Sequence, residues 1–359
     1  MTDSPIFWGE NWFSLLAQGL EQMNRVILGD SPSAALSTEP YPPEPAFATL
    51  NRVRLDLPTM RLREREVAAC GTLPTLIVAP YALHDASIAD FSEGHSVAQT
   101  LAAEELGPIA VTHWKSASPE MRWFSIDSYL ADLNVAIDDL GGRAALVGIC
   151  QGGWLAAAYA ARFPNKVGPL VLAGAPIDLA TAESALTRAV AATEPELIRR
   201  SVDLWGGRVL GRNALSLQSL GLVPSFGATS ALQSSGDDAL DEKFKRWNAY
   251  TVNLPGEYFI QTTEWLFREN RLAGGGFPAL GRICNLGCIP VPIFVLAAQD
   301  DEIVAPAQAL AVKALCANAE VATQVVPGRH LSLFLGRRTL NDAWNEIARW
   351  LHKNNARFG

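Results

Sequence analysis

Short, nearly continuous apolar runs recur along the chain and alternate with stretches whose apolar residues follow helical spacing. Continuous runs of this kind are typical of strands in a parallel sheet that is buried on both faces. An additional run at 52–57 alternates apolar and polar residues, which predicts a strand with one face exposed. The continuous runs cover residues 75–79, 109–113, 144–149, 170–173 and 293–298.

Helix-like stretches separate the strand-like runs in the first half of the chain, at 96–105, 126–140 and 153–162. Strand and helix therefore alternate from residue 73 to 175, which predicts a doubly wound, mostly parallel α/β sheet. The pattern resumes at 291, reaches a last strand near 323–327 and ends in a helix expected over 339–353.

The alternation stops between residues 177 and 289, where the sequence is mostly helix-like with Gly and Ser breaks. An insertion with this pattern predicts a helical cap on a core formed by residues 49–176 and 290–359. No internal repeat is present, so a main domain with one large insertion fits the 359-residue length.

The N-terminal 48 residues have a different character from the core. Residues 7–28 carry a broad apolar stripe at helical spacing, and residues 29–48 are rich in Pro, Ser and Glu, which predicts a helix and an extended connector. The stripe fits either a helix packed on the domain or a surface that docks on something hydrophobic. The chain begins without a secretory signal pattern, and no apolar run is long enough to span a membrane.

Net charge and cysteine content narrow the classes of partner and compartment. The charge of −8 and the pI near 5.2 argue against a nucleic-acid partner, because such binding depends on Lys and Arg. The five cysteines are odd in number and scattered, so a disulfide framework is not expected and the cytosol is favoured. Cys284 and Cys288 lie four residues apart, but no second Cys pair or nearby His completes a zinc site, so no metal is expected.

The sequence Gly148-Ile-Cys150-Gln-Gly152-Gly153 lies between a predicted strand and an Ala-rich predicted helix. A nucleophile flanked by glycines at a sharp strand-to-helix turn is the elbow of the α/β-hydrolase fold. Glycines are needed there because the nucleophile's backbone is strained and neighbouring chain passes close. Cys150 therefore replaces the serine that is usual at this turn, and a thiolate suits acyl exchange among thioesters, esters and hydroxyls.

Partners for Cys150 follow in the order expected of this fold, acid and then histidine. Asp301 follows the strand 293–298 and lies three residues before Val304, whereas Asp300 is better suited to satisfying local backbone. His330 follows the predicted last strand and is the candidate base. The other histidines are expected to have structural or surface roles, namely His84, His95, His113 and His352.

Two backbone amides are the candidates for stabilising the oxyanion of an acyl-transfer intermediate. The fold uses the N–H of the residue after the nucleophile, here Gln151, and one from the loop after an earlier strand. In that loop Pro80 has no N–H, so Tyr81 or Ala82 must supply it, and we favour Tyr81.

Over residues 50–352 the chain resembles the polyhydroxyalkanoate (PHA) synthases and the intracellular PHA depolymerases, two related α/β-hydrolase families with a cysteine nucleophile. Residues 148–153 and 296–304 resemble the nucleophile box and acid loop of the synthases, and residues 112–114 and 124–129 are similar to segments of both families. Cys150-Gln151, residues 257–262 and residues 330–338 are similar to the depolymerases. Two positions depart from the synthases: Trp154 replaces a small polar residue, and Glu302 replaces a histidine.

The resemblance implies that Cys150 accepts the acyl group, His330 is the general base, Asp301 orients it, and no cofactor is needed. The leading hypothesis is hydrolysis of hydroxyacyl esters or a polyester, of the depolymerase type. The second is acyl transfer from hydroxyacyl-CoA, of the synthase type. The third is an inactive protein that binds polymer granules through its N-terminal helix. A cytosolic location, including the granule surface, fits all three, and the oligomeric state stays open.

Overall fold

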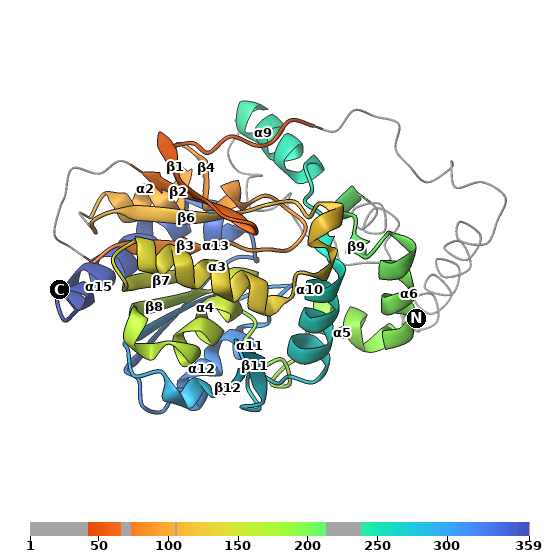
Figure 1. Cartoon of the computed structure of the whole chain (residues 1–359). Helices are drawn as coiled ribbons and strands as arrows, with labels where there is room; N and C mark the ends of the chain where they lie inside the picture. The colour runs from red at the N-terminus through yellow and green to blue at the C-terminus, as the bar shows by residue number, and fades with distance from the viewer. Residues whose placement is uncertain (1–41, 66–72, 105, 213–237, 359) are drawn as a thin grey trace, which may run out of the picture.

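The computed structural model describes residues 42–65, 73–104, 106–212 and 238–358 (Figure 1). The helix expected over residues 7–28, and most of the connector that follows it, lie outside the described residues. An eight-stranded sheet forms the core, in the order β1-β2-β6-β3-β7-β8-β13-β14. The strands are β1 Asn51–Asp56, β2 Met60–Arg65, β3 Thr75–Val78, β6 Ile109–Trp114, β7 Ala144–Ile149, β8 Val167–Ala173, β13 Ile293–Ala298 and β14 Val321–Val326.

Six neighbouring strands of this sheet, β6, β3, β7, β8, β13 and β14, are mutually parallel, and β1 and β2 form an antiparallel edge. Helices cover both faces, so the expected doubly wound α/β-hydrolase fold is confirmed. The helices of the core are α2 Val97–Ala102, α3 Ile126–Asp139, α4 Gln151–Arg162, α11 Pro306–Leu310, α12 Val312–Leu315, α13 Ser332–Leu335, α14 Arg337–Thr339 and α15 Asn345–Asn355. Shorter elements are η2 Ala86–Ala89, β4 Asp90–Ser92, β5 His95–Ser96, η3 Pro119–Trp123 and η4 Pro164–Lys166.

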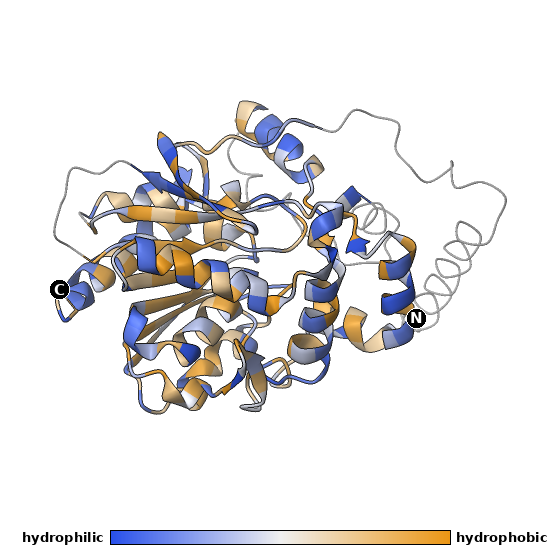
Figure 2. Ribbon diagram, viewed as in Figure 1, coloured by the Kyte–Doolittle hydropathy of each residue, from blue (hydrophilic) through white to orange (hydrophobic). Residues whose placement is uncertain are grey.

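Successive residues of the central strands enter two different hydrophobic clusters, one on each face of the sheet. In β7, Ala144 and Leu146 belong to the cluster that contains residues of α3 and α4. Ala145, Val147 and Ile149 belong to the cluster that contains residues of α2 and α15. Because both faces are covered, the strand is apolar at every position, and Figure 2 accordingly colours the central strands mostly orange.

Strand β2 was not predicted, because its sequence Met-Arg-Leu-Arg-Glu-Arg is dominated by charged residues. In the structure Met60 and Leu62 are fully buried, and the three arginines of the strand are only partly exposed. Glu64 is also buried and is paired with Arg52 and Arg54 of β1. Ion pairing across the antiparallel edge therefore lets a charged segment form a strand.

The C-terminal helix is less regular than expected. It begins with α14, continues as a π-helical turn over Leu340–Trp344 and then becomes α15. The indole N–H of Trp344 donates to the carbonyl of Leu333 at 2.7 Å, which ties the turn to α13. A helical period alone does not reveal such a one-turn widening.

Between β8 and β13 the described chain is mostly helical, with two short antiparallel pairs, β9–β10 and β11–β12 (Figure 1). Residues 213–237 of this segment lie outside the described residues. The expected cap boundaries at 177 and 289 stay a prediction. Its elements are α5 Ala185–Ala192, α6 Pro195–Leu204, β9 Arg208–Val209, α9 Asp238–Ala249, β10 Leu254–Pro255, α10 Gly256–Gln261, the π-helix η5 Thr262–Arg268, β11 Phe277–Ala279, β12 Arg282–Cys284 and η6 Leu286–Cys288.

Candidate active site

Cys150 lies between the end of β7 and the start of α4, in a conformation that L-residues rarely adopt. Its φ is +49° and its ψ is −119°. The strain is held by backbone hydrogen bonds, from Cys150 N to Ala173 O at 2.8 Å and from Gly153 N to Cys150 O at 2.9 Å. Strained backbone at a strand-to-helix turn is a common property of nucleophile positions.

The glycines around Cys150 are required by close approach of neighbouring backbone. A Cβ on Gly152 would lie 2.0 Å from the carbonyl oxygen of Val78, at the end of β3. A Cβ on Gly148 would lie 2.5 Å from the Cα of Gly153, and one on Gly153 would lie 2.3 Å from the Cβ of Ala175. Gly152 therefore allows the turn to lie against β3, and Gly148 and Gly153 allow it to pack on itself and on Ala175.

We expect Gly152→Ala to lower the free energy of unfolding by at least about 2 kcal/mol, because the methyl group overlaps backbone that cannot move aside cheaply. Gly276→Ala is the matched control, since a Cβ there would meet nothing within 4 Å and its φ is not positive. Urea unfolding of both variants measures the difference. Equal stabilities for the two variants would contradict the close approach.

Asp301 and His330 come together from two neighbouring strands of the sheet. Asp301 follows β13, and His330 follows β14 and precedes α13. Nδ1 of His330 lies 2.8 Å from Oδ2 of Asp301. The other carboxylate oxygen, Oδ1, accepts the N–H groups of Ile303 at 2.9 Å and Val304 at 2.8 Å. Asp301 is thus fixed by backbone on one side and orients the imidazole with the other.

Asp300 does not contact the histidine ring. Its N–H donates to the carbonyl of Gly328 at 3.0 Å, and its side chain is exposed. Glu302, the next residue, accepts the backbone N–H of His330 at 3.2 Å and pairs with Arg329 at 3.3 Å. The acid loop therefore holds His330 through both its ring and its backbone.

His330 and Cys150 are both buried, at 1% and 7% exposed. Burial alone lowers the pKa of His330, but the charges of Cys150 and Asp301 outweigh it and hold the pKa well above the ordinary value of 6.5. Nε2 has no hydrogen bond of good geometry to any described residue, although the sulfur of Cys150 is near enough to act on the ring. The ring thus carries an acid on one nitrogen and leaves the other for the cysteine and a reacting group.

The two candidate oxyanion amides lie on either side of the contact between α4 and the end of β3. Gln151 is the first residue of α4, and Tyr81 follows β3 by three residues. Neither N–H donates a hydrogen bond to another described residue. Tyr129 and Tyr258 contact the Tyr81 ring, a contact that the sequence did not reveal. Both lie in segments that carry the family resemblance, but no local pattern links them to Tyr81.

His113 has neither ring nitrogen available for catalysis. Arg63 donates from Nε to Nδ1 of His113 at 2.8 Å, so Nδ1 must accept, and Nε2 lies 2.9 Å from Oδ2 of Asp85. The tautomer follows from the arginine, which can only donate.

His95 is held by the carbonyl of Leu335 at 2.6 Å and by Arg337 at 3.0 Å. The ring of His84 is tilted by 34° against that of Trp247, with 4.8 Å between the centroids, and burial lowers the pKa of His84 to about 4.

We expect Asp85→Ala to lower the free energy of unfolding by about 3 kcal/mol at pH 7, because it leaves the buried His113 without its buried carboxylate partner. Burial raises the pKa of Asp85, but hydrogen bonds from His113 and Ser87 outweigh it and set the pKa below its ordinary value. A depressed folded-state pKa stabilises above the unfolded-state value of about 4 and loses this effect as pH falls through the folded value.

Urea unfolding should therefore show a constant difference between wild type and Asp85→Ala from pH 7 to about pH 5, which narrows below about pH 4. Asp342→Ala is the control, because its pair with Arg338 is exposed and worth less than about 1 kcal/mol. If the difference in free energy of unfolding between wild type and Asp85→Ala grew as the pH fell, it would contradict the pairing of an ionised Asp85 with His113.

The described residues contain no group of three or more His, Cys, Asp and Glu side chains that could hold a metal ion. Cys284 is buried and donates from Sγ to the carbonyl of Ala158, whereas Cys288 is exposed. No helix in the described part of the chain is long and apolar enough to cross a membrane.

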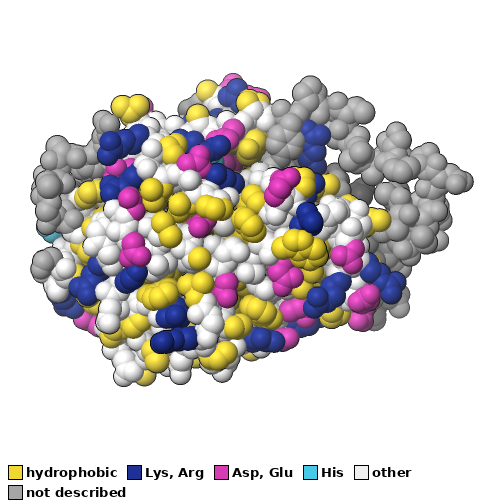
Figure 3. Space-filling model, viewed as in Figure 1, with side chains coloured by type: hydrophobic (Ala, Val, Ile, Leu, Met, Phe, Trp, Pro, Cys, Tyr) yellow, Lys and Arg dark blue, Asp and Glu magenta, His cyan; other side chains and the backbone are white. Residues whose placement is uncertain are grey.

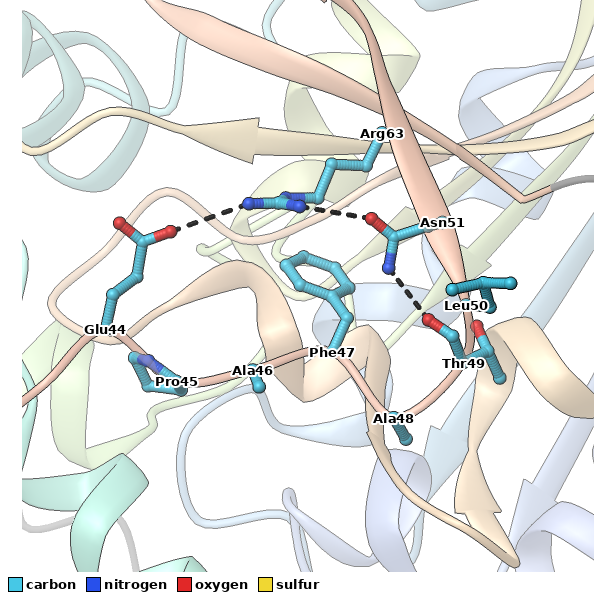
Figure 4. Close-up of a pocket in the computed structure, with 9 residues that line it drawn as sticks. All are labelled: Glu44, Pro45, Ala46, Phe47, Ala48, Thr49, Leu50, Asn51 and Arg63. Atoms are coloured by element: carbon cyan, nitrogen blue, oxygen red, sulfur yellow. Dashed lines mark hydrogen bonds and ion pairs between the residues drawn. The ribbon is translucent and has the colours of Figure 1, made fainter.

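A surface pocket of about 590 Å³ lies near the antiparallel edge of the sheet, lined by residues 44–51 and Arg63 (Figure 4). Arg63 is held there by Asn51 and Glu44 as well as by His113. None of the lining residues belongs to the candidate triad. On the face seen in Figure 3, acidic and basic side chains are interspersed among apolar ones.

Comparisons with known proteins agree with this fold. The family model of the α/β-hydrolase fold matches residues 8–336. The monoacylglycerol lipase of Paleococcus ferrophilus has a TM-score of 0.53 at 16% identity, over 82% of this chain and 99% of the lipase. An esterase from Thermogutta terrifontis has a TM-score of 0.52 at 15% identity, over 86% of this chain and all of the esterase chain (100%). At these identities the likeness shows the fold alone.

Sequence relatives point to one group within the fold. A poly(3-hydroxyalkanoate) polymerase subunit PhaC from Synechocystis sp. is 30% identical over 300 residues, which cover 78% of this chain and 77% of that protein. The PhaC subunit of Allochromatium vinosum is 26% identical over 58% of this chain and 59% of its own length. The chain is therefore an enzyme that acts on esters or thioesters, and it belongs to the PHA synthase superfamily of the α/β-hydrolase fold.

Proposed function

We propose that the protein transfers hydroxyacyl groups from a CoA thioester to a hydroxyl group through an acyl-cysteine on Cys150, as a PHA synthase would. The observation that carries the proposal is the 2.8 Å contact between His330 and Asp301, beside a cysteine held at φ +49°. The PhaC relatives support the synthase-type reaction over the hydrolysis that the sequence alone favoured.

Acylation follows from the position of His330. Nε2 of His330 holds the proton that the Cys150 thiol gives up, and the sulfur attacks the thioester carbonyl. The oxyanion that forms is stabilised by the N–H groups of Gln151 and Tyr81. When the intermediate collapses, the carbon–sulfur bond to CoA breaks, and the CoA sulfur leaves with the proton from His330. An acyl-Cys150 thioester remains, at little cost because one thioester has replaced another.

Deacylation uses the same groups in reverse. The hydroxyl of a second hydroxyacyl group gives its proton to Nε2 of His330 and attacks the Cys150 thioester. The carbon–sulfur bond then breaks, and the Cys150 sulfur recovers the proton. Asp301 stabilises the imidazolium that forms in both steps. Cysteine, histidine and acid supply every proton transfer and bond, so the proposed reaction needs no cofactor.

Burial of the site supports transfer to an alcohol rather than to water. Cys150 and His330 are 7% and 1% exposed, and water that reached the acyl-cysteine would hydrolyse it. We further propose that residues 177–289 are the cap that restricts water, that the product is a polyester, and that the enzyme works in the cytosol at the granule surface.

Hydrolysis is the second candidate, and Glu302 favours it. This residue lies where the resembling synthases have a histidine, and its carboxylate accepts the backbone N–H of the candidate base. Residues 257–262 and 330–338 are similar to the depolymerases as well. In this version His330 activates water instead of a hydroxyl, and a free hydroxy acid is released.

Intact-protein mass spectrometry after brief exposure to hydroxybutyryl-CoA, and separately to an activated ester, tests the proposal, with Cys150→Ala as the control. We expect one hydroxyacyl adduct on the wild type and none on the variant, followed by CoA release with polymer and little free acid. An adduct formed only from an ester, with free acid as the product, would favour hydrolysis. Absence of an adduct from either donor would reject both candidates.

A further inference from the structure

The hydroxyl group of Tyr81 joins three parts of the protein. Its single hydrogen is shared between the carbonyl of Lys115, after β6, at 3.1 Å and the carbonyl of Asn253, before β10, at 3.2 Å. Its oxygen accepts the hydroxyl hydrogen of Tyr129, on α3, at 2.9 Å. The same Asn253 carbonyl also accepts the N–H of Ala117 at 2.9 Å. A residue whose N–H is a candidate oxyanion donor is thus anchored, by its side chain, to the segment between β8 and β13.

Tyr258 of α10 contacts the Tyr81 ring and lies near a second aromatic residue beside the site. Its ring centroid is 5.1 Å from that of Tyr81 and 6.4 Å from that of Trp154. The indole N–H of Trp154 donates to Oε1 of Gln151 at 2.6 Å, which fixes the side chain of the other oxyanion candidate. One residue from the inserted segment therefore lies near both the ring of Tyr81 and the indole that bonds to the Gln151 side chain.

The backbone beside these residues has little freedom to adjust. The indole N–H of Trp114 donates to the carbonyl of Ala79 at 2.7 Å, two residues before Tyr81. Gly152 packs so closely on Val78 that a Cβ would not fit. A shift of the Tyr81 side chain is therefore transmitted to its own backbone rather than absorbed by β3. Burial raises the pKa of both Tyr81 and Tyr258, so the hydroxyl groups stay protonated.

We propose that Tyr81 and Tyr258 are positioning residues. They make the alignment of the two oxyanion amides depend on the packing of residues 253–258 against the core. The proposal rests on the proposed acyl-cysteine function. Acyl transfer is then fast only while residues 253–258 are packed against the core, and a substrate that displaces them lowers the rate of acyl transfer. Misplacement of a catalytic group by about 1 Å costs on the order of 100-fold in rate.

Two reactions of Cys150 separate this role from a general one. Acylation by a p-nitrophenyl ester builds an oxyanion, whereas alkylation by iodoacetamide is a displacement at carbon that builds none. Tyr81→Phe removes only the hydroxyl group that reaches Lys115 and Asn253. We expect it to slow acylation by about 10- to 100-fold, mainly through kcat rather than KM, and to leave alkylation within about 2-fold. Tyr129→Phe should slow acylation less, because it removes one bond to the Tyr81 hydroxyl.

Tyr159→Phe is the matched control, since its buried hydroxyl bonds to Asn134, outside this cluster. It should change neither rate. Unchanged acylation in Tyr81→Phe and Tyr129→Phe would overturn the proposal, as would equal losses of acylation and alkylation, which indicate general distortion. If Tyr81→Phe fails to fold, the split between the two rates in Tyr129→Phe decides. A wild-type Cys150 that is alkylated but never acylated would reject the proposed function itself, and the proposal with it.

Discussion

Cys150→Ala is expected to lower kcat for ester or thioester turnover by at least about 10⁴-fold, because no acyl-enzyme can form without the sulfur. The residue lies in a strained conformation that the surrounding backbone maintains, so the smaller side chain should leave the turn intact. Release of CoA or p-nitrophenol under saturating substrate measures the loss. Circular dichroism and the unfolding midpoint should match those of the wild type.

Cys288→Ala is the control for this experiment, since it removes an exposed thiol far along the chain from the elbow. It should keep full activity. Retention of activity in Cys150→Ala would assign the nucleophile to another group. Loss of activity in both variants would indicate damage to the fold rather than to the chemistry.

The parts of the site that lie close together in the sequence could be predicted from it. The elbow is one continuous stretch, and the glycines that it needs are explained by the approach of Val78, Gly153 and Ala175. The choice of Asp301 over Asp300 used only the spacing to Val304, and in the structure Oδ1 of Asp301 accepts the Val304 N–H. Such patterns are readable because local backbone geometry imposes them.

Contacts between distant segments were not predictable. The carbonyls that hold the Tyr81 hydroxyl belong to Lys115 and Asn253, and the latter is 172 residues away. Neither has a local pattern, because any residue has a carbonyl group. The same holds for Asp85 and His113, whose pairing depends on the crossover between β3 and β6. The sequence suggested only a structural or surface role for His113.

Strand β2 illustrates a third reason why an element could not be predicted from the sequence. Its charged residues contradict the apolar pattern that identifies the central strands, and their pairing with β1 becomes evident only once the strands are aligned. The short β9–β10 and β11–β12 pairs are also hidden, since two- and three-residue strands are too short for any period. The parallel centre of the sheet was predictable because burial on both faces imposes a strong, continuous signal.

Asp301→Asn is expected to lower kcat by about 10⁴-fold, the loss seen when the orienting acid of a triad becomes an amide. An amide at this position can donate to Nδ1 of His330 and so selects the tautomer with hydrogen on Nε2, which cannot accept the Cys150 proton. The imidazolium also loses its counter-charge. The N–H groups of Ile303 and Val304 can still bond to the amide oxygen, so the loop should keep its shape.

The matched variant is Asp300→Asn, one residue earlier. Its side chain is exposed, and its backbone bond to Gly328 does not depend on the carboxylate. We expect kcat within about 3-fold of the wild type, as for a surface substitution. Steady-state kinetics on both variants at pH 7 and 9 give the comparison. Because the fault in Asp301→Asn is one of tautomer and charge, its loss of kcat should be larger than its change in KM, whereas equal effects in the two variants would remove Asp301 from the proposed triad.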